Sequence, residues 1–383
     1  RMYQRMSHLT SFVLLFTFVL FSDGAFLPPN TAATRWTSDM VLCYMDARST
    51  PGPQMNPEFV WSAAKFEMLL AKHDKPLDDA RRVPVDTLFD SVLFTAGEWY
   101  DGKSFWPGQG GVTNASDWLA FIDLQLTIGG VQLDSAAATV SAALAHELRP
   151  SVVLTIPGPD PRQESFGLAP GLTRNLNFSR VEDRLAAVEW FTATAYAKFT
   201  ARRFSHVYLA GFYWYVETIL PGDAAILPAL SAHIKTSVDP SLVMMWIPYY
   251  QTNPEQLTYL RNWRALGFDF VTLQPNFAFH NSSADERFAS VKALATNLTL
   301  GVELELPDYV RNPTVKDWRE SFDAYLAHVN AWAKQGSGRL MRSYYYGNAF
   351  VTSFATNATN FEYYERLYRF VKGEVDVSHM SEL

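Results

Sequence analysis

The amino-acid sequence predicts an α/β fold, a single (β/α)8 TIM barrel with long βα loops after strands 1–3. The first supporting observation is that short apolar runs, typical of buried parallel strands, recur eight times along the chain. The second is that stretches with helical periodicity separate these runs, since strands that alternate with helices favour a parallel sheet. The eight runs cover residues 41–45, 91–95, 151–156, 206–212, 242–247, 268–273, 299–305 and 340–345.

Helix signals lie between the apolar runs. Ser179 with Glu182, and Ser283 with Glu286, have the spacing of capping boxes, which predicts a helix beginning at each serine. A third amphipathic helix is predicted where apolar residues recur on one face. These residues are Val315, Trp318, Phe322, Tyr325, Val329 and Trp332.

The alternative fold is a doubly wound open sheet. Such a sheet usually carries a glycine-rich phosphate turn after an early strand, and residues 108–111 lack the dinucleotide-binding spacing. The closed barrel is therefore preferred, and nicotinamide or flavin chemistry is disfavoured. Because no linker or low-complexity tract interrupts the chain, we expect residues 26–383 to form one domain.

The amino-terminal segment predicts secretion. Arg1 and Arg5 precede an apolar run at residues 9–21, and small residues follow it, so residues 1–25 have the pattern of a signal peptide. The run is shorter than the roughly 20 residues that span a bilayer, so no stable membrane span is expected after its removal. Five glycosylation sequons agree with this, at Asn114, Asn177, Asn281, Asn297 and Asn357. We expect a secreted or extracellular glycoprotein, with a lysosome-like compartment or the cell surface as alternatives.

Composition and motif spacing exclude several classes of function. Net charge is −7 and the basic residues are scattered, which argues against a nucleic-acid partner. The eight histidines lack metal-ligand spacing, so neither a metal nor another cofactor is expected. No serine nucleophile elbow is present, and Cys43 is the single cysteine. The many aromatic residues fit either a large core or a sugar-binding cleft.

In a barrel of this kind the active site is built at the carboxyl ends of the strands. Acidic, amide and aromatic residues follow the apolar runs and would converge on that face. Tyr213 and Tyr215 are the tyrosines in phase with Glu217, because neighbouring residues of a strand alternate in direction. The predicted substrate-binding residues are Asp46, Glu98, Trp99, Tyr213, Tyr215, Tyr249, Gln274, Asn276 and Tyr345.

Glu217, Glu303 and Glu305 are the candidate catalytic carboxylates. Glycosidic bond cleavage needs one carboxylic acid and one carboxylate on either side of the bond. Glu217 follows the fourth run and Glu305 ends the seventh, which resembles the placement of acid/base and nucleophile in retaining barrel glycosidases. Glu303 lies two residues before Glu305 and points to the same side of the sheet. We expect Glu217 to be the acid/base and Glu305 the nucleophile, with Glu303 orienting it or binding substrate and the reverse order of the pair left open.

Four segments of the chain carry a resemblance to a known family: residues 211–217, 246–250, 267–276 and 301–305. Together they are similar to the motifs of the barrel family catalogued as domain of unknown function 4855, over roughly residues 40 to 350. The resemblance implies a glycosidase-like barrel of the kind found in bacterial surface and secreted proteins. It implies no particular substrate.

The sequence therefore predicts a glycoside hydrolase that cleaves a polysaccharide or oligosaccharide by a retaining, two-carboxylate mechanism. Carbohydrate is the expected partner, and the oligomeric state is left open. The alternative is a non-catalytic, lectin-like barrel, which would keep the aromatic cleft but lack the catalytic geometry.

Overall fold

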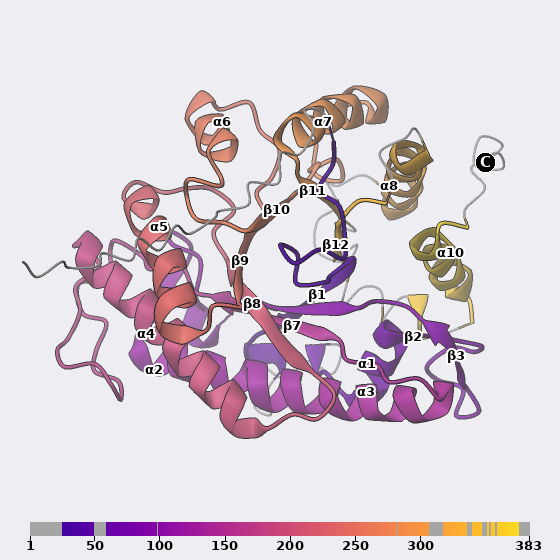
Figure 1. The fold of residues 1–383 in the computed structure, drawn as a ribbon, viewed down its shortest axis with the longest axis horizontal. Coiled ribbons are helices and arrows are strands. Elements are labelled where there is room, and N and C mark those ends of the chain that lie inside the picture. Colours follow the sequence, from indigo (N-terminus) through magenta and orange to yellow (C-terminus); the bar gives the residue numbers. More distant parts are fainter. Residues whose placement is uncertain are drawn as a thin grey trace, which may run out of the picture.

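Eight parallel strands form a closed barrel in the computed structural model, which describes residues 25–49, 59–97, 99–280, 282–305, 317–334, 339–346, 351, 354–356 and 358–374 (Figure 1). Around the ring the strands follow the order β1, β12, β11, β10, β9, β8, β7 and β4. Their bounds are β1 (Asp39–Met45), β4 (Ser91–Ala96), β7 (Ser151–Ile156), β8 (Tyr208–Trp214), β9 (Val243–Trp246), β10 (Phe270–Leu273), β11 (Gly301–Glu305) and β12 (Arg342–Tyr345). Each strand overlaps one of the eight apolar runs, so the predicted fold class is confirmed.

Helices lie outside the ring of strands (Figure 1). They are α1 (Ala63–Leu70), α2 (Ala115–Leu124), α3 (Val131–Leu144), α4 (Val181–Arg202), α5 (Asp223–His233), α6 (Pro254–Arg261), α7 (Ala284–Leu298), α8 (Trp318–Trp332) and α10 (Phe361–Lys372). Among the described residues, no helix combines the length and apolar character that a membrane span requires.

The connections that follow the first two barrel strands carry extra structure. A two-stranded antiparallel ribbon, β2 (Ala71–His73) with β3 (Pro84–Thr87), lies between β1 and β4. Two short strands, β5 (Lys103–Ser104) and β6 (Gly111–Val112), pair in the loop after β4. Residues 157–180 separate β7 from the next helix, α4. These segments agree with the long loops predicted after the first three strands.

The predicted capping boxes have different outcomes. The Ser283 side chain accepts a hydrogen bond from the Glu286 backbone N–H and caps α7, as expected. The prediction at Ser179 is wrong, because α4 begins at Val181. The Ser179 N–H donates instead to the Asn177 side chain at 2.9 Å, and this local turn moves the N-cap one residue on, to Arg180.

Several predictions fall outside the described residues. These are most of the predicted signal peptide (residues 1–24), Glu98, Val315, Asn281 and Asn357. Of the other sequon asparagines, Asn297 is exposed on α7, whereas Asn114 and Asn177 are half-buried. Secretion and glycosylation stay predictions.

Two apolar cores result from this architecture. The large one lies between the strands and the helices, and the smaller one fills the inside of the barrel. Strand residues of the inner core include Met40, Leu42, Leu93, Val153, Ala210, Tyr213, Val243, Met245 and Phe270. This packed interior leaves the carboxyl ends of the strands as the place where a site can form.

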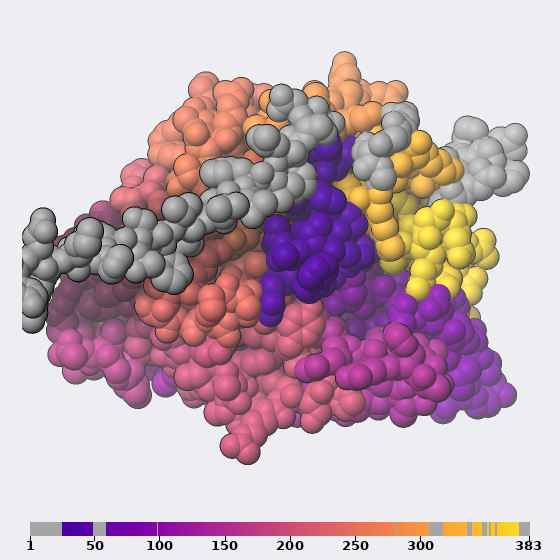
Figure 2. All heavy atoms as spheres, in the orientation of Figure 1, coloured from indigo at the N-terminus to yellow at the C-terminus, as the bar shows by residue number. Residues whose placement is uncertain are grey.

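A buried ion pair joins β1 and β12, the first and last strands along the chain, whose pairing closes the barrel. Asp39, at the start of β1, accepts hydrogen bonds from Arg342 at 2.6 Å and from the Tyr344 hydroxyl at 2.7 Å, both on β12. Arg339 reaches the other carboxylate oxygen at 3.0 Å. In the space-filling view, indigo residues of the amino-terminal part lie directly beside orange and yellow carboxy-terminal ones (Figure 2).

We predict that Asp39→Ala destabilises the fold by about 3 kcal/mol, because Arg342 is left buried without its carboxylate partner. Urea unfolding followed by circular dichroism measures the change. Asp79→Ala is the matched control: Asp79 pairs with Arg81 at an exposed position, where an ion pair contributes little. Equal unfolding midpoints for the two variants would contradict a role of Asp39 in barrel closure.

Candidate active site

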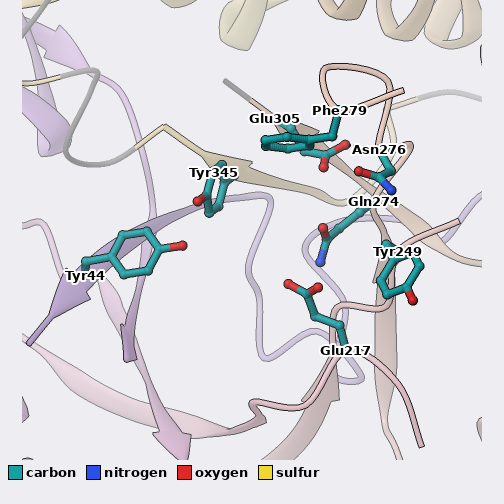
Figure 3. A pocket seen from close by; sticks show the side chains of 8 residues that line it. All are labelled: Tyr44, Glu217, Tyr249, Gln274, Asn276, Phe279, Glu305 and Tyr345. Atoms are coloured by element: carbon teal, nitrogen blue, oxygen red, sulfur yellow. Dashed lines mark hydrogen bonds between the residues drawn. The ribbon is translucent and has the colours of Figure 1, made fainter. Parts of the chain in front are cut away.

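A cavity of about 340 Å3 lies at the carboxyl ends of six barrel strands (Figure 3). Its lining residues come from β1 and β12 on one side and from the ends of β8, β9, β10 and β11 on the other. They are Tyr44, Glu217, Tyr249, Gln274, Asn276, Phe279, Glu305 and Tyr345. The cavity therefore brings together six of the predicted site residues and two that the sequence analysis did not select, Tyr44 and Phe279.

Glu305, the last residue of β11, is held through one of its two carboxylate oxygens. Oε2 accepts hydrogen bonds from the Asn276 backbone N–H at 2.5 Å and from the Tyr325 hydroxyl. Oε1 is buried and has no hydrogen-bond partner among the described residues. The side chain thus combines a fixed orientation with one acceptor that no described residue satisfies.

Burial and the charge of Glu217 raise the pKa of Glu305 to about 7, although three contacts oppose this shift. The opposing contacts are the hydrogen bonds from Tyr325 and Asn276 and the positive charge of Arg287. A carboxyl group with this pKa changes its protonation state near neutral pH, as acid–base chemistry requires.

Glu217 lies on the loop after β8 and faces the same cavity. Burial raises its pKa to about 7, and a hydrogen bond with the Gln274 side chain opposes the shift. In Figure 3 the Gln274 amide nitrogen points toward the Glu217 carboxylate. Gln274 is itself anchored, because its Nε2 also donates to the Ile247 carbonyl at 2.8 Å.

Glu303 lies one layer below the cavity, inside the barrel. It is 1% exposed, and its Oε1 accepts a hydrogen bond from Ser343 of β12 at 3.3 Å. Burial and the charges of Glu305 and Glu217 raise its pKa well above the ordinary value, which favours its protonated form. The structure therefore places Glu305 at the cavity and Glu303 behind it.

Asn276 contributes to the site through its backbone N–H as well as through its side chain. Its φ of +56° lies in the left-handed region, which asparagine adopts more readily than most residues with a side chain. In this conformation its N–H donates to Glu305 while its side chain lines the cavity. The sequence placed Asn276 at the site but gave no sign of this second contact.

Four predicted substrate-binding residues do not line the cavity. Asp46 is fully buried and binds Arg48, and Trp99 packs in the core with its Nε1 donating to Asp117 at 3.0 Å. The other two brace the rim: the Tyr213 hydroxyl donates to the Tyr215 carbonyl at 3.3 Å, and the Tyr215 hydroxyl donates to the Ala96 carbonyl at 3.0 Å.

Aromatic rings form much of the cavity wall. Tyr44 and Tyr345 meet edge to face, with ring centroids 5.8 Å apart. Phe279 is 45% exposed although it is a large apolar side chain, and it lines the opening. Tyr44 could have been found from its phase, because it follows the inward-facing Met40 and Leu42 at intervals of two residues.

Residues 51–369 match a family model described as "Domain of unknown function (DUF4855)". The chain belongs to this family. The match confirms the resemblance that the sequence motifs indicated. No curated protein matches this member of the DUF4855 family.

Three solved structures are similar to this DUF4855 member over most of their length, each at 11% identity. A xylanase from Paenibacillus barcinonensis has a TM-score of 0.40 and covers 83% of this chain and 86% of its own. An intracellular xylanase from Thermoanaerobacterium saccharolyticum scores 0.41, with 84% and 89% covered. A chitinase from Chromobacterium violaceum scores 0.43, with 88% and 83% covered. With scores below 0.5, these likenesses carry no argument about the reaction.

We predict that Glu305→Gln is more stable than the wild type at pH 8, by roughly 1–3 kcal/mol. The pKa of Glu305 is about 7 in the folded state against an ordinary 4.5, so folding binds protons between these values. Ionisation of Glu305 consequently lowers stability as the pH rises through this window, and the variant lacks that loss.

Urea unfolding at pH 4.5 and pH 8 measures the difference, which should be small at pH 4.5. Glu164→Gln, a change at an exposed glutamate of the loop after β7, is the control and should follow the wild type at both values. If Glu305→Gln is no more stable than the wild type at pH 8, burial does not raise the pKa of Glu305 in the folded protein.

Proposed function

We propose that the protein is a glycoside hydrolase that cleaves O-glycosidic bonds of an oligosaccharide or polysaccharide with retention of configuration. One observation carries the proposal: two carboxyl groups, Glu217 on the loop after β8 and Glu305 at the end of β11, face one cavity whose other walls are aromatic rings and amides. Rings can stack on the C–H faces of a sugar, and amides can bind its hydroxyl groups. The paired carboxyls supply what glycosidic bond cleavage needs.

The surroundings of the two carboxyls support different roles. The Glu305 carboxylate receives hydrogen bonds from a backbone N–H and a phenol, both of which favour its ionised form. Glu217 has the weaker support of the Gln274 amide. Since two nearby negative charges disfavour each other, the pair shares one proton near neutral pH, and the proposed reaction assigns that proton to Glu217.

In the proposed reaction Glu217 donates its proton to the leaving oxygen while Glu305 attacks the anomeric carbon. The bond between that carbon and the leaving oxygen breaks, and a covalent glycosyl–Glu305 ester forms. A water molecule then attacks the same carbon, its proton passes to Glu217, and the electron pair of the ester bond returns to Glu305. Both carboxyls are restored for the next cycle.

We predict that Glu217→Gln and Glu305→Gln each lower the release of reducing ends by at least about 100-fold, because the first change removes the acid/base and the second removes the nucleophile. The assay uses a broad panel of plant, fungal, bacterial and host polysaccharides. Product NMR during early turnover reports the anomeric configuration, and inversion would remove the nucleophile role of Glu305. If the wild type binds a polysaccharide without cleaving it, and both variants bind it equally, the protein is a lectin-like barrel.

Phe279 is expected to contact a sugar unit beyond the cleaved bond, because it is exposed at the opening of the cavity. We predict that Phe279→Ala raises KM for long oligosaccharides about 3- to 10-fold, the loss expected for one ring contact. Hydrolysis of a small aryl glycoside should change little. Trp36→Ala is the control, since Trp36 is 61% exposed in the turn before β1, at the opposite end of the barrel. Equal effects on both substrates would place Phe279 outside any outer subsite.

A further inference from the structure

We propose that Tyr325 of α8 is a positioning residue, which holds Oε2 of Glu305 so that Oε1 is the oxygen that attacks the sugar. This inference deepens the proposed function and rests on it. It assigns a role to a helix of the outer layer, which contributes no residue to the cavity lining.

The Tyr325 hydroxyl acts both as a hydrogen-bond donor and as an acceptor. It donates to Oε2 of Glu305, and it accepts from the Phe277 backbone N–H at 3.2 Å. A phenol has a single proton to donate. Because the Phe277 N–H is itself a donor, the phenol oxygen must accept that bond through a lone pair. The proton of Tyr325 is therefore directed to Glu305.

The loop after β10 completes the arrangement. The Asn276 N–H donates to the same Oε2, and the next N–H along the chain, that of Phe277, holds the tyrosine. Two consecutive backbone groups thus fix the carboxylate, one directly and one through Tyr325. The carboxylate cannot rotate without losing both hydrogen bonds at Oε2.

The other oxygen has the opposite surroundings. Oε1 of Glu305 is buried and unpartnered among the described residues, and Glu305 lines the cavity. A buried acceptor without a partner is costly unless a ligand or water meets it there. Oε1 is consequently the atom available to form the bond with the anomeric carbon, while Oε2 becomes the carbonyl oxygen of the ester.

The Tyr325 ring is itself held in place. It is fully buried and packs edge to face against Phe288 at 5.1 Å and Phe277 at 6.1 Å between ring centroids. Burial and the negative charge of Glu305 raise the pKa of Tyr325 well above its ordinary value, so the phenol keeps its proton. The donor is therefore fixed in orientation before any substrate binds.

The test compares Tyr325→Phe with Tyr346→Phe. Tyr346 is a matched control because it is 1% exposed and its hydroxyl has no hydrogen-bond partner among the described residues. For Tyr325→Phe we expect kcat to fall about 10- to 100-fold, as for loss of a hydrogen bond to a charged group, with KM within about 3-fold. The hydrogen bond from Tyr325 favours the ionised form of Glu305, so its loss should raise the pKa of Glu305. The acid limb of the pH profile of kcat/KM should therefore move to higher pH. Tyr346→Phe should leave both quantities unchanged.

A second measurement does not depend on activity. The pKa of the Glu305 carboxyl, followed by 13C NMR and assigned with Glu305→Gln, should rise in Tyr325→Phe and stay constant in Tyr346→Phe. If Tyr325→Phe does not fold, 3-fluorotyrosine introduced at position 325 keeps the shape of the side chain and strengthens the donor. The Glu305 pKa should then fall.

The outcomes separate the two proposals. An unchanged Glu305 pKa with either replacement at position 325 overturns the positioning role of Tyr325, whether or not the protein hydrolyses glycosides. A shifted pKa in a protein that cleaves no glycoside supports the contact and overturns the proposed function. A shifted pKa with wild-type kcat shows that the contact does not orient the attacking oxygen.

Discussion

The burial of three carboxyl groups in the mouth of one barrel is the constraint on which the rest of the site depends. Burial raises the pKa of Glu217, Glu303 and Glu305, and the charge of Glu217 raises the pKa of the other two further. A buried carboxyl group with a raised pKa lowers the stability of the folded state at neutral pH. The surrounding barrel therefore has to supply a rigid frame, which the two apolar cores and the buried Asp39–Arg342 pair provide.

The fold could be predicted because parallel barrel strands are buried on both faces and so read as continuous apolar runs. Apolar runs do not define the strand edges: the run at residues 206–212 ends two residues before β8 does, because Tyr213 and Trp214 continue the strand toward the polar end. The start of α4 was misplaced for another reason. A serine and a glutamate have capping-box spacing, but the local turn at Asn177 forms first and takes the Ser179 N–H.

The candidate site was predicted where strand ends alone determine position, and missed where other contacts decide it. Glu217, Glu305 and Gln274 follow directly from the rule that barrel sites lie at carboxyl strand ends. Trp99 obeys the same rule but turns into the core, where Asp117 accepts its Nε1–H. Tyr325 was recognised as part of an amphipathic helix, yet helical periodicity does not reveal which buried group its hydroxyl meets.

Two carboxyl groups at the carboxyl ends of barrel strands become chemically different through contacts from outside the strands. The oxygen Oε2 of Glu305 is reached by a backbone N–H of the β10 loop and by a phenol of α8, whereas Glu217 meets an amide. Only the first set contains a donor that has to cross from the outer helical layer. The hydrogen bonds that favour the ionised form of Glu305 therefore depend on how α8 packs against the barrel. In the mechanism that we propose, an outer helix contributes to the chemistry as well as to stability.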